Sequence, residues 1–299
     1  MSEISANQIK ELREKTGAGV LDCKKALVES GGDLEKAVDI LRKSGAAKAD
    51  KKSGRITAEG RVAAKIEGSE GVLLEVNCET DFVAKTDDFQ NFVDALAAHA
   101  LKTRPANLEA LLDSSLNGQK VKETVQNLIA KTGENLSVRR FTLVSAGAGE
   151  KLGSYIHMGN KIGVIVKAKG PQDQLSEGVL RDVAMHVAAS SPQYLSPEKI
   201  PAEALEREKA IYKEQMKDMN KPPQVLEKIL DGKIARFADE VCLLQQIFVK
   251  DPTGKQSVSQ YLKQIHPEIT VVDFFRYQVG EGIAKREDNF AEEVAKTRG

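Results

Sequence analysis

The sequence predicts an α+β protein built from several units. Apolar residues follow helical spacing over roughly the first fifty positions, whereas the chain from Ile56 onward alternates apolar and polar residues, as strands do. A succession of two strands and a helix then occurs twice, and a highly charged helical segment interrupts the second occurrence. At 299 residues the chain is also longer than a single hydrophobic core usually supports, so we expect more than one domain.

Residues 1–54 predict a three-helix domain followed by a linker. Ser5 is a suitable N-cap for the first helix, and a TGAG sequence ends that helix. A second helix at residues 21–29 stops at a Gly-Gly pair, after which Asp33 can cap a third helix. Residues 46–55 contain no large apolar side chain and carry a local basic excess, so we expect them to connect two domains.

Residues 55–145 predict the first half of a mixed core. Two segments of alternating character, residues 61–68 and 71–78, are joined by a short turn, which indicates a β-hairpin with antiparallel pairing. The elements expected after this hairpin are two helices and a strand, at residues 89–101, 108–131 and 138–145.

Residues 146–196 and 240–265 predict the second half of the core. A hairpin at residues 152–170 and a helix at residues 180–190 repeat the earlier order of elements. The helices of the two halves align around His99 and His186, which favours an internal duplication. A further strand is expected at residues 241–249.

Residues 197–239 predict a helical hairpin that interrupts the second half. Two narrow apolar stripes lie on either side of a Lys-Pro-Pro break at residues 221–223. Because so few residues are apolar, the hairpin can bury only one seam, and we expect it to project as an antiparallel arm. Residues 266–299 are expected to form a C-terminal module, with a strand at 270–279 and a short helix after Asp288.

Charge and cysteine content restrict the function classes. Forty-four basic and forty-four acidic residues balance, which argues against direct nucleic-acid binding. The three cysteines, Cys23, Cys78 and Cys242, are far apart and form no CxxC pair, so neither a disulfide framework nor a zinc ribbon is expected. No signal-peptide pattern or long apolar run is present, so we expect a cytoplasmic protein that does not bind membranes.

Catalytic motifs are absent from the sequence. The pair Gly254-Lys255 is followed by Gln256 and lacks the earlier glycine of a phosphate-binding loop. No HExxH or GxSxG pattern occurs, and the acidic residues near position 80 do not have the spacing of a calcium loop. We therefore expect no catalytic residues, no metal site and no cofactor.

Two segments carry a specific resemblance. Residues 12–27 read LREKTGAGVLDCKKAL, and residues 75–85 read EVNCETDFVAK. Both resemble signature motifs of the bacterial elongation factor Ts family and occur in the family's order and spacing. The resemblance continues through residues 152–157, the helical arm and residues 275–283, and so covers essentially the whole chain.

The resemblance implies both an architecture and an activity. It implies an N-terminal ubiquitin-associated-like domain, a duplicated α+β core, a coiled-coil arm and a C-terminal module. It further implies a nucleotide exchange factor, not an enzyme, that promotes GDP release from the translational GTPase elongation factor Tu. By the resemblance, the turn formed by Thr80, Asp81, Phe82 and Val83 pushes into the GTPase near its magnesium site. Additional partner contacts are implied for Val20, Leu21 and His157.

Alternatives remain open for these residues and for the function. Phe82 can equally be a core aromatic, with Asp81 as the cap of the following helix. Leu21 can be buried within the three-helix domain, and His157 can be an exposed turn residue. His99 and His186 are interpreted as structural. The alternative functions are an adaptor that binds a small domain through its N-terminal helices, and an enzyme with an unrecognised site.

Overall fold

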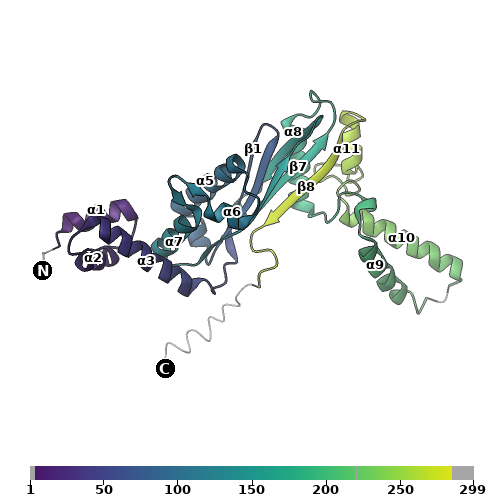
Figure 1. Ribbon diagram of the computed structural model, residues 1–299. Coiled ribbons are helices and arrows are strands. Elements are labelled where there is room, and N and C mark those ends of the chain that lie inside the picture. Colours follow the sequence, from purple (N-terminus) through teal and green to yellow (C-terminus); the bar gives the residue numbers. More distant parts are fainter. Residues whose placement is uncertain (1–3, 220, 285–299) are drawn as a thin grey trace. The chain divides into compact units, whose positions relative to one another are not determined.

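The computed structural model describes residues 4–219 and 221–284 (Figure 1). Helices and antiparallel sheets occur together, which confirms the predicted α+β class. The described chain divides into two compact units. The first comprises residues up to Ala63, Leu74–Phe141 and the residues from Gln278, whereas the second comprises Ala64–Leu73 and Thr142–Tyr277. The finer division into the five predicted segments stays a prediction.

The N-terminal helices form where the capping residues predict them. They are α1 (Ala6–Thr16), α2 (Val20–Glu29) and α3 (Leu34–Lys52). Ser5 forms a capping box with Gln8, and Asp33 caps α3 by accepting a hydrogen bond from the Lys36 amide. Their shared core is apolar and small, and consists of Leu12, Cys23, Ala26, Leu27 and Ala37.

The expected connection at residues 46–55 is largely helical, because α3 continues to Lys52. Its alanines and lysines are strong helix formers, which explains the continuation. The helix also has a partner in α7 (Val121–Thr132), since a Cβ at buried Gly45 would lie only 3.7 Å from the Ala130 side chain. The segment therefore joins the helical domain to the core as a packed helix.

The first sheet has the strand order β1-β2-β5. Its strands are β1 (Glu59–Glu67), β2 (Glu70–Cys78) and β5 (Leu136–Ser145), in agreement with the predicted hairpin and third strand. The helices of this part of the chain are α4 (Asp81–Ala84), α5 (Asp87–Thr103), α6 (Leu108–Asp113) and α7.

The single helix predicted at residues 108–131 is wrong, because a small hairpin separates α6 from α7. Its strands are β3 (Ser115–Leu116) and β4 (Gln119–Lys120). Asn117 and Gly118 between them both have positive φ, at 53° and 85°. An Asn-Gly pair is the preferred sequence for this type of turn, so the break has a local cause that the helical spacing concealed.

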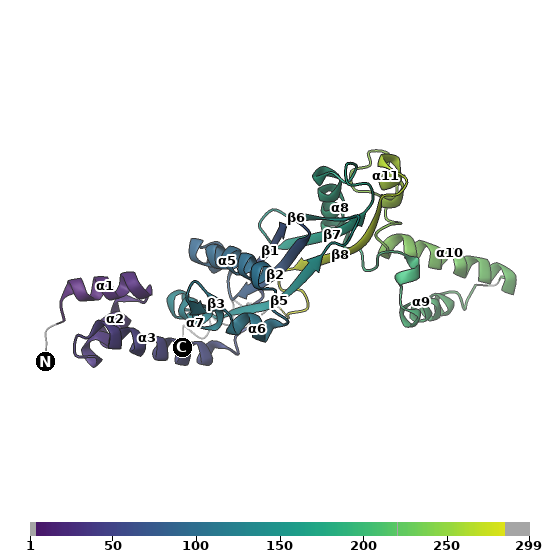
Figure 2. The same cartoon turned by 45° about the horizontal axis from the view of Figure 1, so that its top comes forward.

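The second unit contains a sheet of order β6-β7-β8, covered by α8 (Figure 2). These elements are β6 (Glu150–Ile156), β7 (Ile162–Lys169), β8 (Thr270–Gln278) and α8 (Glu177–Ser190), and β6 pairs antiparallel with β7. Helix α8 approaches the sheet closely, since a Cβ at Gly153 would lie 2.3 Å from the Leu180 Cβ. Helix α11 (Val258–Ile265) was not predicted, although Ser257 and Gln260 form a capping box before it.

The strand predicted at residues 241–249 is also wrong. Helix α10 (Pro223–Val241) ends there, and the backbone then turns, with the amides of Gln245 and Gln246 both donating to the Cys242 carbonyl. Within the described part of the chain, this segment forms two isolated bridges, Cys242 with Tyr194 and Ile247 with Ser257. The apolar run was correctly interpreted as buried, because Leu243 and Phe248 belong to the core, but burial alone does not distinguish a strand from a turn.

The predicted helical hairpin consists of α9 (Ala202–Gln215) and α10, which contact each other. A short 3-10 helix, η1 (Pro197–Lys199), precedes α9, and Pro222 and Pro223 stand at the start of α10. A small apolar cluster closes the base of the hairpin, formed by Ile200, Ala238, Val241 and Cys242. The short helix expected after Asp288 lies outside the described residues.

Candidate functional site

A one-turn helix, α4, follows the end of β2 and presents the candidate turn. Thr80 is its N-cap, and the Thr80 hydroxyl accepts a hydrogen bond from the Val83 amide at 3.4 Å. Only Lys85 separates α4 from Thr86, which caps α5 in the same way. Two threonine caps so close together hold α4 to a single turn between two longer elements.

Phe82 is exposed at this turn, with 80% of its surface accessible. The alternative that Phe82 is a core aromatic is therefore wrong for the folded chain, and so is the alternative that Asp81 caps the helix, because Thr80 does so. Asp81 instead pairs with Lys85 at 2.6 Å on the surface. Val83 is only 8% exposed and packs inward, so the turn is anchored by Val83 and presents Phe82.

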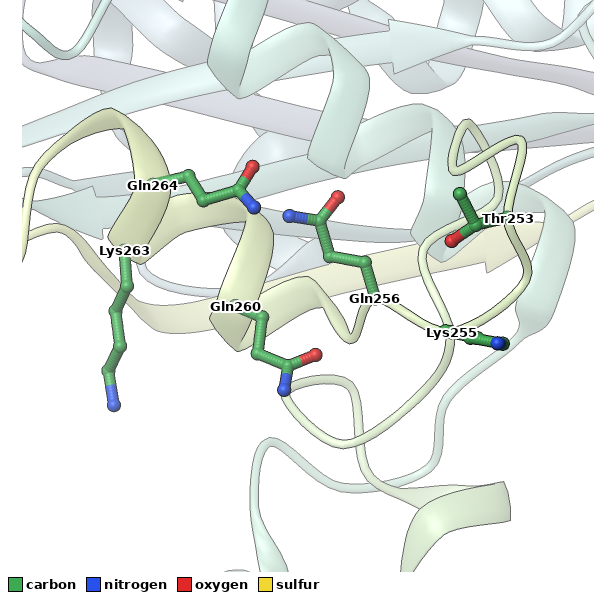
Figure 3. A pocket seen from close by; sticks show the side chains of 6 residues that line it. All are labelled: Thr253, Lys255, Gln256, Gln260, Lys263 and Gln264. Atoms are coloured by element: carbon green, nitrogen blue, oxygen red, sulfur yellow. The ribbon is translucent and has the colours of Figure 1, made fainter.

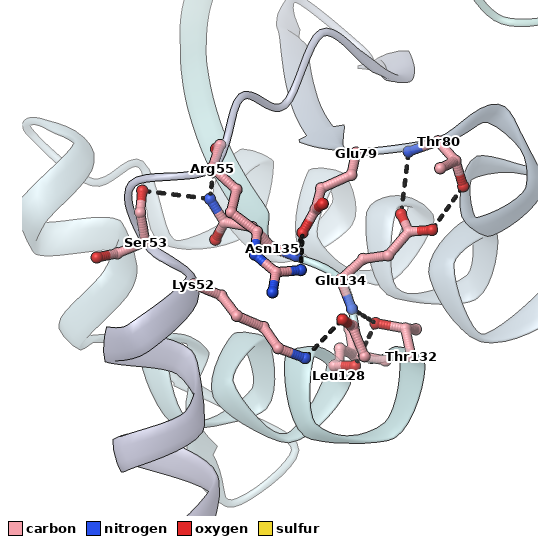
Figure 4. A network of polar contacts seen from close by, with 10 residues as sticks. Lys52, Ser53, Arg55, Glu79, Thr80, Leu128, Thr132, Glu134 and Asn135 are labelled. Carbon is pink, nitrogen blue, oxygen red and sulfur yellow. Dashed lines mark hydrogen bonds and ion pairs between the residues drawn. The ribbon is translucent and has the colours of Figure 1, made fainter. Parts of the chain in front are cut away.

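Polar contacts hold Thr80 and the preceding Glu79 in place at the start of the turn (Figure 4). The carboxylate of Glu134 accepts two hydrogen bonds from Thr80, one from the amide at 3.0 Å and one from the hydroxyl at 2.6 Å. The neighbouring Glu79 accepts the Asn135 amide at 2.6 Å and pairs with Arg55 at 3.3 Å. No local sequence signal marks Glu134, because it lies 54 positions from Thr80, the residue that it holds.

Val20 and Leu21 lie at the start of α2 and are 51% and 75% exposed. The N-cap of α2 is Gly19, whose lack of a side chain leaves this helix start uncovered. The alternative that Leu21 is buried among the three helices is therefore wrong. Two adjacent apolar side chains at a helix start form a candidate contact surface for another protein.

His157 lies in the turn between β6 and β7, as predicted. Its amide donates to the Ile162 carbonyl at 2.9 Å, and its Nδ1 lies 3.2 Å from the Tyr155 hydroxyl. The next residue, Met158, is 87% exposed and was not singled out by the sequence. No motif marks a methionine in such a turn, so only its exposure identifies it.

The other two predicted histidines have structural partners. Nε2 of His186 lies 3.0 Å from Oε1 of Gln246, and Nδ1 accepts the Val249 amide at 3.1 Å. Burial lowers the pKa of His186, which is completely inaccessible. His99 lies 2.7 Å from the Ser114 hydroxyl. Both interpretations as structural residues agree with these contacts.

No reactive constellation is found among residues 4–219 and 221–284. These residues contain no group of three or more His, Cys, Asp or Glu side chains placed to hold a metal ion. All three cysteines are buried, and burial raises the pKa of Cys242 to about 11, which disfavours the thiolate. Among the same described residues, no helix has the length and apolar character needed to cross a bilayer.

An open hollow beside α11 has a polar lining (Figure 3). Amide and lysine side chains dominate it, and its lining consists of Thr253, Lys255, Gln256, Gln260, Lys263 and Gln264. Such groups can hydrogen-bond a polar surface, and neither a histidine nor a carboxylate is among these six lining residues.

The exposed apolar side chains at helix starts and turns, Val20, Leu21, Phe82 and Met158, form candidate surfaces for contact with another protein. The sequence profile described as Elongation factor TS matches residues 79–281. Elongation factor Ts of Alkalilimnicola ehrlichii is 50% identical over 299 residues, which cover 99% of each chain. The chain belongs to the elongation factor Ts family of translation elongation factors.

Proposed function

We propose that this chain is a guanine-nucleotide exchange factor that promotes GDP release from the GTPase elongation factor Tu. The observation that carries the proposal is Phe82, a large apolar side chain held exposed at a capped turn whose neighbour Val83 is buried. An apolar side chain on rigid backbone is suited to enter a partner, since little further ordering is required when it binds. Membership of the elongation factor Ts family supports the same reading.

The mechanism is exchange by negative coupling between nucleotide and exchange factor. The chain binds the nucleotide-free GTPase best, so by linkage its binding weakens GDP and GDP weakens its binding, until GTP displaces it. Phe82 acts as a wedge between elements of the partner, and Asp81 redirects hydrogen bonds or cations around the magnesium ion without ligating it. The chain itself performs no covalent chemistry and needs no cofactor.

The free energy required exceeds what one side chain supplies. A shift of four decades in nucleotide affinity requires about 5.5 kcal/mol of differential binding. Burying one phenylalanine contributes about 1.5–3 kcal/mol. Further contacts must therefore share the work, and we assign them to Val20 and Leu21 on the N-terminal helices and to His157 in the second unit.

The same proposal includes the finer organisation. Residues 1–54 act as a ubiquitin-associated-like docking domain, and residues 55–145 with 146–196 and 240–265 form a duplicated core. Residues 197–239 form the arm, and residues 266–299 form the C-terminal module. The protein works in the cytoplasm on its GTPase partner, without direct binding to nucleic acid or membrane.

The test measures release of a fluorescent GDP analogue from purified elongation factor Tu, in the presence of magnesium, as this protein is titrated. The proposal requires acceleration at substoichiometric protein. Absence of acceleration with a folded sample and a matched partner removes the proposal. Binding to the GTPase with the same affinity whether or not GDP is bound would support an adaptor instead.

A further inference from the structure

We propose that Glu134 is a positioning residue that orients the Phe82 turn from a distant part of the chain. The inference rests on the function proposed above and identifies what holds its wedge in place. It is carried by the two hydrogen bonds from Thr80 to the Glu134 carboxylate, at 3.0 Å from the amide and 2.6 Å from the hydroxyl.

The starts of two other helices, α1 and α11, show the role that these two bonds fill. In a capping box, the residue three positions after the N-cap accepts the N-cap amide with its own side chain. Gln8 does this for Ser5, and Gln260 does it for Ser257, both within three residues. In α4 the corresponding position is Val83, whose side chain is apolar and buried and has no acceptor.

Glu134 fills this missing role. Its Oε2 accepts the Thr80 amide that a local glutamate or glutamine would otherwise accept, and its Oε1 fixes the Thr80 hydroxyl. The hydroxyl then faces the Val83 amide as the helix cap. A local cap would require a polar side chain in place of Val83, which would remove the apolar anchor. The long-range cap permits a buried Val83 beside an exposed Phe82.

Glu134 is itself held rigidly by the end of α7. Gly133 ends that helix in the left-handed conformation, with φ of 77°, and the Glu134 amide donates to the Thr132 hydroxyl at 3.3 Å. Lys52, the last residue of α3, donates to the Gly133 carbonyl at 2.5 Å. The ends of α3 and α7 therefore fix the carboxylate that fixes α4 (Figure 4).

A second set of contacts holds Glu79, the residue that precedes the turn. Glu79 precedes Thr80 and accepts the Asn135 amide, while Nδ2 of Asn135 donates to the carbonyls of Ser53 and Arg55 at 3.3 and 3.0 Å. Glu134 thus binds Thr80, and its neighbour Asn135 binds Glu79, the residue before Thr80. This pairing joins the segment after α3 to the turn, so the orientation of Phe82 depends on where the N-terminal helices meet the core.

The experiment compares Glu134→Ala, Glu134→Gln and Asn107→Ala. Asn107 caps α6 by accepting the Ala110 amide at 2.9 Å, so its loss removes a cap of similar kind from a helix outside the candidate turn. We expect Glu134→Ala to slow GDP release at saturating protein by about ten- to a hundredfold, because small misplacements of a contact group are costly. Asn107→Ala should leave the rate unchanged.

Glu134→Gln separates positioning from charge. The glutamine oxygen can accept a hydrogen bond from the Thr80 amide, and the glutamine NH₂ can donate to the Thr80 hydroxyl. The two contacts between residue 134 and Thr80, which we call the clamp, therefore persist without the negative charge. We expect a rate within about threefold of the parent, well above that of the alanine variant. Equal loss in the alanine and glutamine variants, or an alanine variant indistinguishable from Asn107→Ala, would overturn the inference.

A second measurement needs no partner and so separates this inference from the proposed function. The chain contains no tryptophan, so Phe82→Trp introduces a single fluorescent reporter at the turn. Its anisotropy should fall when Glu134→Ala is added and stay unchanged when Asn107→Ala is added. An unchanged anisotropy in both double variants contradicts the clamp, whether or not the parent protein accelerates GDP release from elongation factor Tu. A fall confined to the Glu134 variant supports the clamp even if the parent protein does not accelerate GDP release from elongation factor Tu.

Discussion

Nε of Arg140 lies 2.6 Å from Oε2 of Glu75, and the Glu75 side chain is completely buried. The other oxygen of this carboxylate accepts hydrogen bonds from Nη1 of Arg139 at 3.0 Å and from the Gly280 amide at 2.8 Å. One buried charge therefore joins β2, β5 and the segment that follows β8. Gly280 has φ of 71°, and a Cβ there would lie 2.3 Å from the Ala58 carbonyl oxygen, so only glycine fits this approach.

Glu75→Ala should destabilise the protein by about 1.5–3 kcal/mol, because it removes the buried carboxylate that accepts hydrogen bonds from Arg139, Arg140 and the Gly280 amide. Urea unfolding followed by circular dichroism measures this. The control is Glu14→Ala, whose partner Lys10 is 3.9 Å away with both side chains mostly exposed. That pair should contribute less than about 0.5 kcal/mol. Similar midpoints for the two variants would show that the buried network contributes little.

Phe82→Ala and Val83→Ala should separate function from stability at neighbouring positions. Phe82 is exposed, so its truncation should change the free energy of unfolding by less than about 0.5 kcal/mol while slowing GDP release from elongation factor Tu. Val83 is buried, so its truncation should cost about 1.5 kcal/mol from the lost apolar burial. Thermal unfolding and GDP-release assays on both variants check this. Normal GDP release by a folded Phe82→Ala variant would rule out the wedge.

Local signals account for the elements that the sequence predicted correctly. Ser5 and Asp33 cap their helices through side chains that are visible in the sequence, and the alternation before and after Gly68 produces β1 and β2. The errors arose where one signal concealed another. Helical spacing masked the Asn117-Gly118 turn, and the apolar run at residues 241–249 concealed a buried turn.

The candidate site was predictable only in part, for a physical reason. The resemblance identified the turn at residues 80–83, but spacing alone could not decide whether Phe82 or Val83 faces inward. The residue that completes the cap, Glu134, is distant in sequence and close only after α7 has packed. A long-range cap leaves no periodic pattern, so it becomes visible only in the folded chain.

Two glycine-to-alanine substitutions should have opposite effects on stability. Gly232 lies within α10, and nothing stands within 4 Å of a Cβ added there, so alanine should stabilise by about 0.5–1 kcal/mol through its higher helix propensity. At Gly153 the added Cβ would lie 2.3 Å from that of Leu180, so alanine should force α8 away from β6 and cost about 1–3 kcal/mol. Differential scanning calorimetry of both variants tests the pair. If the unfolding temperatures of both variants shifted in the same direction, the packing described for Gly232 or for Gly153 would be contradicted.

His186 should make the protein less stable as the pH falls below 6.5, the ordinary pKa of a histidine. Burial lowers its pKa in the folded state, although the hydrogen bond with Gln246 acts in the opposite direction. Below pH 6.5 the unfolded chain therefore binds a proton that the folded chain does not, which favours unfolding. Protonation of Nδ1 would also remove the acceptor of the Val249 amide.

His186→Gln removes this titration, so the loss of unfolding free energy between pH 7.5 and pH 5.5 should be smaller in the variant than in the parent. Urea unfolding at the two pH values measures the difference, and the comparison within each variant cancels any constant cost of the substitution. His99→Gln is the matched control. The pKa of His99 is also lowered by burial, with Lys102 acting in the same direction, but its side chain is less buried. His99→Gln should change the pH dependence of stability in the same direction as His186→Gln but by less. An equal or larger effect of His99→Gln would show that His186 is not the main source of the acid sensitivity.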